Sequence, residues 1–234
     1  MGLKALLRRA MGESTTGALE YFLRPSVRGS FGGPFNGQRH RREMYDELVG
    51  RLRFEAIVET GTFRGTTTGV FGKAGVPVYT VEAHPRFHTY CRVRFWWEGR
   101  SNVHLYRSDS RTFLRHLLGD TSVPRHDVFF YLDAHWAEDL PLREELEIIF
   151  GNWKHTVVMI DDFEVPGSSY KFDDYGPGKA LNLAYLQPVL SAYGPAVFFP
   201  SENAASEPDR GCVVLLHGVQ PPAGGFRTMA PYRA

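Results

Sequence analysis

Short apolar runs recur along most of this chain, and segments with helical spacing separate them. The runs predict strands at 54–59, 77–82, 103–106, 127–133, 156–161, 196–200 and 211–216. Helices are predicted near 38–52, 65–74, 85–98, 110–118, 139–152 and 178–192. Because the runs lack polar alternation, we expect strands covered on both faces, as in a parallel α/β sheet. The last two strands follow each other across a loop, which predicts an antiparallel hairpin.

The chain divides into three predicted segments. Residues 54–216 form the domain of strands and helices, 1–53 form an N-terminal basic arm and helix, and 217–234 form an irregular tail rich in proline and glycine. The arm holds ten Lys and Arg residues against five acids. This excess is compatible with an anionic substrate, an acidic partner, a membrane surface or a solvated helical face. The arm could also support a homo-oligomer.

Composition narrows the class of protein. The chain has 234 residues and is 43% hydrophobic, which is enough to bury a full core. A formal net charge of +1 offers no global field for nucleic acid. The two cysteines, Cys91 and Cys212, fall in a predicted helix and a predicted strand, so a disulfide is not expected. No apolar run is long enough to span a membrane, and we therefore expect a cytoplasmic protein.

The turn after the first predicted strand is the most informative motif. It runs Glu59-Thr60-Gly61-Thr62-Phe63-Arg64-Gly65-Thr66. Glycines at the third and seventh places let the backbone approach a ligand closely, and the start of the next helix favours a polar or anionic group. Dinucleotide and phosphate loops require Gly-x-Gly-x-x-Gly or Gly-Lys-Ser/Thr, and neither is present. An acid followed by Gly-x-x-x-Gly is typical of an S-adenosylmethionine (SAM) site, and the alternative is an ordinary turn.

The next two predicted strands also end in polar residues. Ligands of open parallel sheets bind outside the carboxyl ends of the strands, where the strand order reverses. Glu82 ends the second strand, where a carboxylate can hold both hydroxyls of a ribose, whether from SAM or from NAD. Asp109 and Ser110 follow the third strand, where they could contact an adenine amine or cap the next helix.

The fourth and fifth predicted strands place acids together. Asp133 and His135 follow the fourth strand, and Asp161 and Asp162 end the fifth. If these strands are neighbours, three carboxylates converge and repel one another unless a cation is present. Oxygen ligands of this kind suit Mg²⁺, Mn²⁺ or Ca²⁺. His135 could then act as general base, as a metal ligand or simply face solvent, and the acids could instead cap helices or pair with Lys or Arg.

Two further segments flank this predicted site. The segment 164–179 is long, aromatic and rich in glycine, as expected of a lid or a wall that selects the acceptor. The turn from Phe35 to Gln38 could fold over the methionine end of a SAM molecule.

These motifs together resemble the class I SAM-dependent methyltransferases, and within them the metal-dependent sugar O-methyltransferases of the macrocin and mycinamicin type. The resemblance covers about 54–216. It implies a Rossmann-like α/β fold: a seven-stranded, mostly parallel sheet with helices on both faces and a C-terminal antiparallel hairpin strand. It also implies roles for particular residues, namely cofactor binding by Glu59, Thr60, Gly61, Thr62, Gly65, Thr66, Glu82, Asp109 and Ser110, metal binding by Asp133, Asp161 and Asp162, and catalysis by His135 and Asp133. The string Asp133-Ala134-His135-Trp136 departs from the family's usual acid-rich string.

The function that we expect from the sequence is SAM-dependent O-methylation of a hydroxyl on a sugar, a glycan or a glycosylated small molecule. A divalent metal, Mg²⁺ above all, would assist. The alternatives are an NAD-dependent oxidoreductase and a catalytically silent Rossmann-type binding module. The missing dinucleotide motif argues against the first, and the converging acids and histidine argue against the second.

Overall fold

The computed structural model describes residues 3–135, 139–201 and 210–233, with side chains from residue 12 onward. Trp136 and most of the predicted hairpin loop lie outside these ranges. The helices are α1 (Leu3–Leu23), α2 (Arg39–Arg51), α3 (Thr68–Phe71), α4 (Pro85–Trp97), α5 (Ser110–Gly119), α6 (Leu142–Asn152) and α7 (Leu183–Tyr193). Two 3₁₀ segments, Pro25–Gly32 and Pro34–Gly37, connect α1 to α2.

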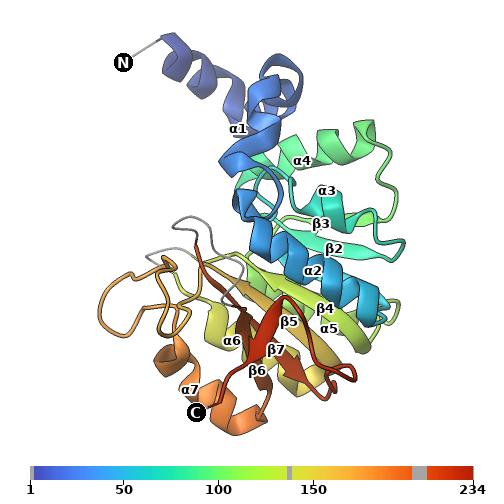
Figure 1. The fold of residues 1–234 in the computed structure, drawn as a ribbon. Coiled ribbons are helices and arrows are strands. Elements are labelled where there is room, and N and C mark those ends of the chain that lie inside the picture. Colours follow the sequence, from blue (N-terminus) through green and yellow to red (C-terminus); the bar gives the residue numbers. More distant parts are fainter. Residues whose placement is uncertain (1–2, 136–138, 202–209, 234) are drawn as a thin grey trace.

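One sheet of eight strands forms the centre of the molecule (Figure 1). The strands are β1 (Ala56–Thr60), β2 (Val78–Val81), β3 (Val103–Tyr106), β4 (His126–Leu132), β5 (Lys154–Asp161), β6 (Ala196–Pro200), β7 (Cys212–His217) and β8 (Met229–Pro231). Their order is β3-β2-β1-β4-β5-β7-β6-β8. The first five are parallel, and β7 pairs antiparallel with both β5 and β6. The predicted parallel sheet with a closing antiparallel strand is therefore confirmed.

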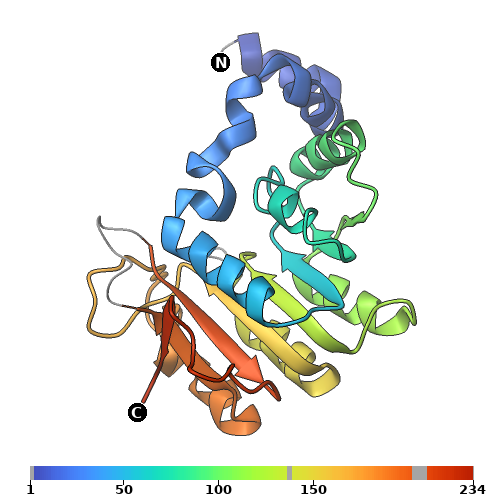
Figure 2. The ribbon, with the colours of Figure 1, turned by 45° about the vertical axis from the view of Figure 1, so that its right-hand side comes forward.

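The strands are buried on both faces, as their unbroken apolar runs predict. Val58 and Phe130 point into a core that α5, α6 and α7 cover. Ile57 and Phe129, one position along each strand, point into a second core that α2 and α3 cover. Alternate residues of one strand face opposite sides of a sheet, so the apolar residues of these strands contribute to both cores. Figure 2 shows helices on either side of the sheet.

Two details of the predicted fold are wrong. The sheet has eight strands instead of seven, because the tail that we predicted to be irregular adds β8 along β6. Pro231 is tolerated there because β8 is an edge strand. The helix predicted near 65–74 is reduced to Thr68–Phe71. Such a short helix carries little dipole, so the predicted attraction of its N-terminus for an anion is weak.

The N-terminal arm packs against the domain. Gly17 of α1 lies so close to α4 that an added Cβ would come within 2.0 Å of the carbonyl oxygen of Arg86. Glu20 is buried and pairs with Arg86 at 2.8 Å and with Arg64, in the turn after β1, at 3.3 Å. An acid of the arm is thus neutralised by arginines of the domain, which joins α1 to α4 and to the turn after β1. Cys91 and Cys212 are buried and free, as predicted.

None of the helices in the described ranges has the length and apolar character that a membrane crossing requires.

Candidate active site

The candidate site lies where the strand order reverses, between β1 and β4. The turn after β1 touches the end of β4, because a Cβ on Gly61 would lie 2.3 Å from the carbonyl oxygen of Asp133. Gly61 has a φ of 89° and Gly65 a φ of 68°, and a Cβ on Gly65 would lie 2.6 Å from the ring of Phe95. Both glycines of the motif are thus required by the packing of the turn itself.

Glu59 holds this turn in place. It is 1% exposed, and its Oε2 accepts hydrogen bonds from the Thr68 hydroxyl at 2.5 Å and the Thr80 hydroxyl at 2.6 Å. Burial raises the pKa of Glu59 to about 7, although the two hydroxyls oppose this shift. Thr60 is fully buried, and Thr62 bonds to Thr80 at 2.5 Å. Glu59 and Thr62 therefore stabilise the conformation of the turn through these contacts.

Glu82, at the end of β2, faces the same turn. Its Oε2 accepts the backbone N–H of Phe63 at 2.8 Å and its Oε1 accepts that of His84 at 2.7 Å. Burial raises the pKa of Glu82, while these two N–H groups lower it. Each oxygen has one protein donor and keeps a second lone pair, so the carboxylate can still accept bonds from a ligand.

Asp109 caps α5, as the alternative interpretation of this residue predicts. Its Oδ1 accepts the backbone N–H of Thr112 at 3.0 Å. Burial alone would raise the pKa of Asp109, but the bonds from Thr112 hold it below its usual range. Ser110 is buried beside Glu145 of α6, a carboxyl that the sequence analysis missed and whose pKa burial raises to about 7.

Asp133, His135 and Asp162 converge at the ends of β4 and β5. One ligand atom from each lies within 4.8 Å of the others. His135 is 6% exposed, and neither of its ring nitrogens has a hydrogen-bond partner among the described residues. Asp161 lies beside them, because Asn36 contacts both Asp161 and Asp133, so the residues predicted to converge at these strand ends do lie together.

Asp161, unlike Asp133 and His135, forms an ion pair with a protein cation. Its carboxylate forms an ion pair with Arg41 of α2, and both side chains are fully buried. Arg41 also donates to Asp162 at 2.7 Å and to the carbonyl oxygen of Gly211 at 2.9 Å. A protein cation therefore supplies part of the neutralisation that we predicted for a metal ion.

The sequence analysis missed Arg41, although the pattern of α2 contains a signal. Met44, Tyr45 and Leu48 form the apolar stripe of this helix and are buried. Position 41 lies three, four and seven residues before them, so it falls on the same face. An arginine on a buried stripe requires a carboxylate partner inside the fold.

Asn36 reaches the same carboxylates from the other side. Its Nδ2 lies 2.8 Å from Asp161 Oδ2 and 3.3 Å from Asp133 Oδ2. Phe35 and Asn36 have positive φ angles of 55° and 54°, and the backbone N–H of Phe35 donates to Thr67 at 2.9 Å. This turn therefore contacts two acids of the candidate site, and its place over a SAM molecule stays a prediction.

The pKa values of the cluster follow from burial and from these cations. Burial and the neighbouring carboxylates raise the pKa of Asp133 well above its usual range. Burial raises the pKa of Asp161 to about 6 against the effect of Arg41. For Asp162, burial is outweighed by Arg41 and Arg210, which lower its pKa. Burial, assisted by the same two arginines, lowers the pKa of His135 to about 4, so its imidazole is neutral at pH 7.

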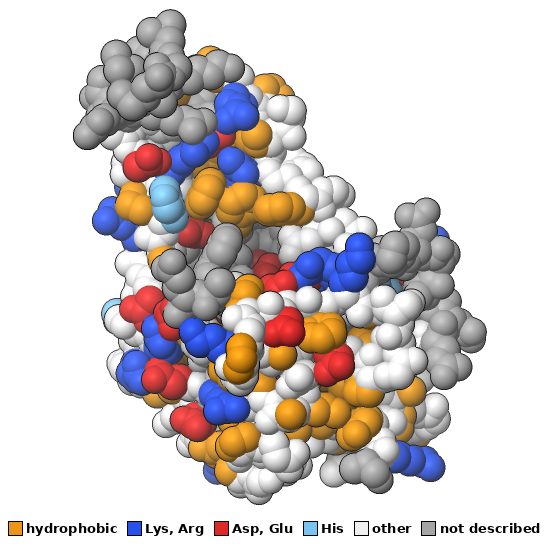
Figure 3. Space-filling model, turned by 90° about the vertical axis from the view of Figure 1, so that its left-hand side faces the viewer, with side chains coloured by type: hydrophobic (Ala, Val, Ile, Leu, Met, Phe, Trp, Pro, Cys, Tyr) orange, Lys and Arg blue, Asp and Glu red, His pale blue; other side chains and the backbone are white. Residues whose placement is uncertain are grey.

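The predicted acceptor wall at 164–179 lies beside this cluster. The Tyr175 hydroxyl bonds to Asp173 and lies 3.4 Å from the carbonyl oxygen of His135. Arg210 bridges the wall to the cluster, because it pairs with Asp162 at 2.6 Å and also with Asp173. Figure 3 shows a face of the molecule that is hollowed below the N-terminal arm, with acidic and basic side chains around the hollow.

The strand order and the position of the site define a Rossmann-like methyltransferase fold. The chain is similar to an O-methyltransferase from Bacillus cereus in complex with S-adenosylhomocysteine (TM-score 0.58, 14% identity, 86% of this chain and 90% of that one). It is also similar to the O-methyltransferase TomG from Streptomyces achromogenes, involved in tomaymycin synthesis and in complex with SAM (TM-score 0.55, 15% identity, 88% and 89%). A third similar structure is a SAM-dependent methyltransferase from Aquifex aeolicus (TM-score 0.50, 15% identity, 88% and 97%).

No protein-family model matches the sequence, and no curated protein matches it significantly. The identities to the solved structures are low, so these similarities establish the fold.

Proposed function

We propose that this protein is a SAM-dependent O-methyltransferase that transfers a methyl group to a hydroxyl of a sugar, a glycan or a glycosylated small molecule, assisted by a divalent metal. The observation that carries this proposal is the convergence of Asp133, His135 and Asp162 at the switch point of a methyltransferase fold. A binding module has no need for a neutral buried histidine beside two acids. The missing dinucleotide motif still disfavours an NAD-dependent oxidoreductase.

The residues around the turn fit SAM. Glu82 keeps lone pairs for the ribose hydroxyls, and Ser110 and Asp109 lie at the start of α5, where an adenine would be held. Glu59, Thr60, Thr62 and Gly65 are buried and would act by holding the turn, while Gly61 and Thr66 would shape its surface. Bound SAM would supply a methyl group on a sulfonium that an oxygen nucleophile can attack.

The cluster also fits a divalent cation. The ring nitrogens of His135 have no partner in the described part of the chain, and Asp162 uses only Oδ1 for its arginines. We infer that Asp133, His135 and Asp162 would be the ligands, with Asp161 held behind them by Arg41 and Asn36. A cation such as Mg²⁺ or Mn²⁺ there would lower the pKa of an acceptor hydroxyl.

The remaining catalysis would come from positioning. His135 is neutral at pH 7, so a ring nitrogen that does not ligate the cation can accept the hydroxyl proton. Its low pKa makes it a weak base, so the cation would have to supply most of the acidification. Tyr175 and the 164–179 wall would orient the acceptor oxygen in line with the methyl group.

Thermal unfolding with S-adenosylhomocysteine, with NAD or with neither tests the cofactor class, and each condition is repeated with Mg²⁺ and with chelator. A ligand at about 100 times its dissociation constant adds roughly 2.7 kcal/mol to the free energy of unfolding. We expect a higher midpoint with S-adenosylhomocysteine and none of this shift with NAD. A shift with NAD alone would replace the proposal with an oxidoreductase, and no shift with either would favour a silent module.

Two broader proposals accompany this function. The buried free cysteines fit a cytoplasmic location.

A homo-oligomer would use the arm, where Phe22, Leu23, Trp96 and Trp97 form an exposed apolar surface on α1 and α4. Light scattering on the purified protein would test the oligomer.

A further inference from the structure

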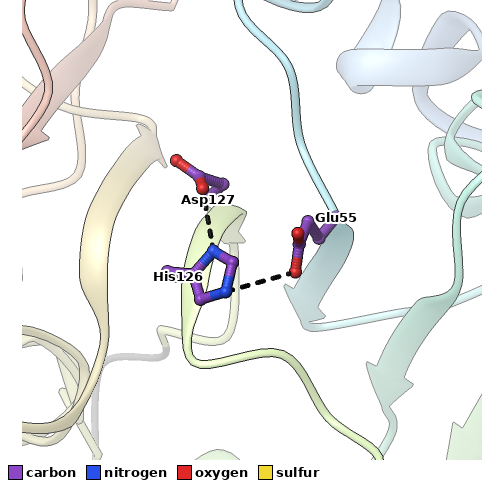
Figure 4. A group of neighbouring side chains, drawn as sticks. All are labelled: Glu55, His126 and Asp127. Carbon is purple, nitrogen blue, oxygen red and sulfur yellow. Dashed lines mark hydrogen bonds and ion pairs between the residues drawn. The ribbon is translucent and has the colours of Figure 1, made fainter.

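A second group of metal-ligating side chains lies at the opposite end of the same strands. Figure 4 shows Glu55 just before β1, with His126 and Asp127 at the start of β4. His126 Nδ1 lies 2.8 Å from Asp127 Oδ2, and His126 Nε2 lies 3.7 Å from Glu55 Oε2. One ligand atom from each of the three residues lies within 4.8 Å of the others.

The sheet topology creates this group. β1, β4 and β5 are neighbours and parallel, so they begin at the same edge. The backbone joins them there, since the N–H of Glu55 donates to the carbonyl oxygen of Asp127 at 2.8 Å. Asp127 and His155 both have positive φ angles, 55° and 54°, although neither is a glycine. Only a few per cent of non-glycine residues adopt this conformation, so their side chains are held in an unusual direction.

His155, in β5, completes the group from the third strand. Its Nδ1 lies 3.6 Å from Asp127 Oδ1, the carboxylate oxygen that does not face His126. Asp127 therefore has a histidine on each oxygen. Beside the group is a hollow of about 440 Å³, lined in part by Glu55, Asp127 and His155. Arg53 also lines this hollow, but its single positive charge is smaller than the combined negative charge of the carboxylates of Glu55 and Asp127.

We propose that Glu55, His126 and Asp127 bind a divalent transition-metal cation, with Zn²⁺ as the preferred ion and His155 as the partner that orients Asp127. One imidazole and two carboxylates, with water in the fourth place, form a ligand set that suits zinc and leaves Mg²⁺ disfavoured. Ligand atoms around a tetrahedral Zn²⁺ lie about 3.3 Å apart, given bonds of roughly 2.0 Å. The side chains are 41% to 57% exposed, so they can make the small rotations that are needed.

This site would be structural and independent of methyl transfer. β4 has seven residues, which places the two clusters on the order of 20 Å apart at its two ends. A bound ion would join the segment before β1 to β4 directly, and through His155 to β5. A metal ion that cross-links these segments would stabilise the edge of the sheet where the strands begin.

Calorimetric titration of the purified chain with Zn²⁺ at pH 7.5 tests this proposal, with Co²⁺ absorption as a report on ligand geometry. We expect His126→Ala to remove one equivalent of bound Zn²⁺, and His155→Ala to weaken that equivalent by about 10- to 100-fold. His135→Ala should keep it, which separates this site from the catalytic cluster.

His104→Ala, an exposed histidine on β3, is the matched control and should bind as the wild type does. Glu55→Gln provides a second removal of a ligand if His126→Ala fails to fold. Equal stoichiometry and affinity in the wild type, His126→Ala and Glu55→Gln would overturn the proposal, as would a wild type that binds no Zn²⁺ outside the catalytic cluster.

Discussion

Two clusters of acids and histidine sit at the two ends of the same strands, and they behave in opposite ways. At the carboxyl ends, His135 is buried and lies with Asp133 and Asp162. At the amino ends, His126 is exposed and lies with Glu55 and Asp127. The residue types are nearly the same. The difference between the clusters therefore comes from their surroundings.

Solvent access shifts the pKa values of the two histidines in opposite directions. Burial lowers the pKa of His135 to about 4. Two nearby arginines add to this shift, and Asp162 opposes it. The hydrogen bond to Asp127 raises the pKa of His126, and the negative charge of Glu55 adds to this shift. Because His126 is exposed, desolvation opposes the shift only weakly. A carboxylate near a histidine is thus insufficient to protonate it.

The buried cluster also needs a permanent cation. Arg41 is fully buried against Asp161, whereas the carboxylates of the exposed cluster are in contact with water. Taking carboxylates out of water costs several kcal/mol each unless a partner is present. The two clusters should therefore respond very differently to the same kinds of substitution.

The largest expected effect is on turnover. His135→Ala should reduce kcat by about 10²- to 10⁴-fold because it removes a proton acceptor or metal ligand, while S-adenosylhomocysteine binding stays intact. The assay is methyl transfer to a hydroxylated acceptor found by screening, with binding followed by calorimetry. His116→Ala, an exposed histidine on α5, is the control. Near-normal turnover in His135→Ala would remove this residue from the mechanism.

The next effect is on stability. Arg41→Met should lower the free energy of unfolding by about 3–5 kcal/mol, because it leaves buried Asp161 without its cation. Urea denaturation measures the change. Arg42→Ala, which breaks an exposed pair with Asp46 on the same helix, should cost less than about 1 kcal/mol. If both variants lost the same small amount, the buried ion pair would not be the support that we infer.

A smaller effect concerns pH. The pKa of Glu59 is about 7 in the folded protein against an ordinary 4.5, so folding favours its protonated form. Its contribution is complete below about pH 4.5 and is lost as the pH rises through 7, by up to about 1.4 kcal/mol per pH unit. Glu59→Gln should remove this part of the slope in denaturation series between pH 5 and 8. Glu43→Gln, on the surface of α2, should keep it.

The smallest effect is at the exposed cluster. In chelator, His126→Ala should leave the free energy of unfolding close to that of the wild type, because exposed ion pairs contribute little. Denaturation with and without Zn²⁺ measures it, and the wild type should gain more stability from the ion than His126→Ala does. A large loss in chelator would mean that the two clusters resemble each other more than their exposure indicates.

Much of the site could be predicted from the sequence because it depends on local pattern. Unbroken apolar runs indicated the strands, and an acid at the end of a parallel strand must lie at one edge of the sheet. Asp133 and Asp162 were placed together on that basis, and the structure brings them together with His135. The separate role of Asp161 was missed, because its partner Arg41 lies far away in the chain.

The sequence by itself thus determined most of the elements, the parallel sheet and the edge where the acids gather, since these follow from periodicity and turn chemistry between near neighbours. Only the tertiary structure decided which acids pair with a protein cation and which do not. Arg41 and Asp162 are 121 positions apart, and Asn36 and Asp161 are 125 apart. Charges act through space and depend on burial, so their balance exists only once the distant segments have packed together.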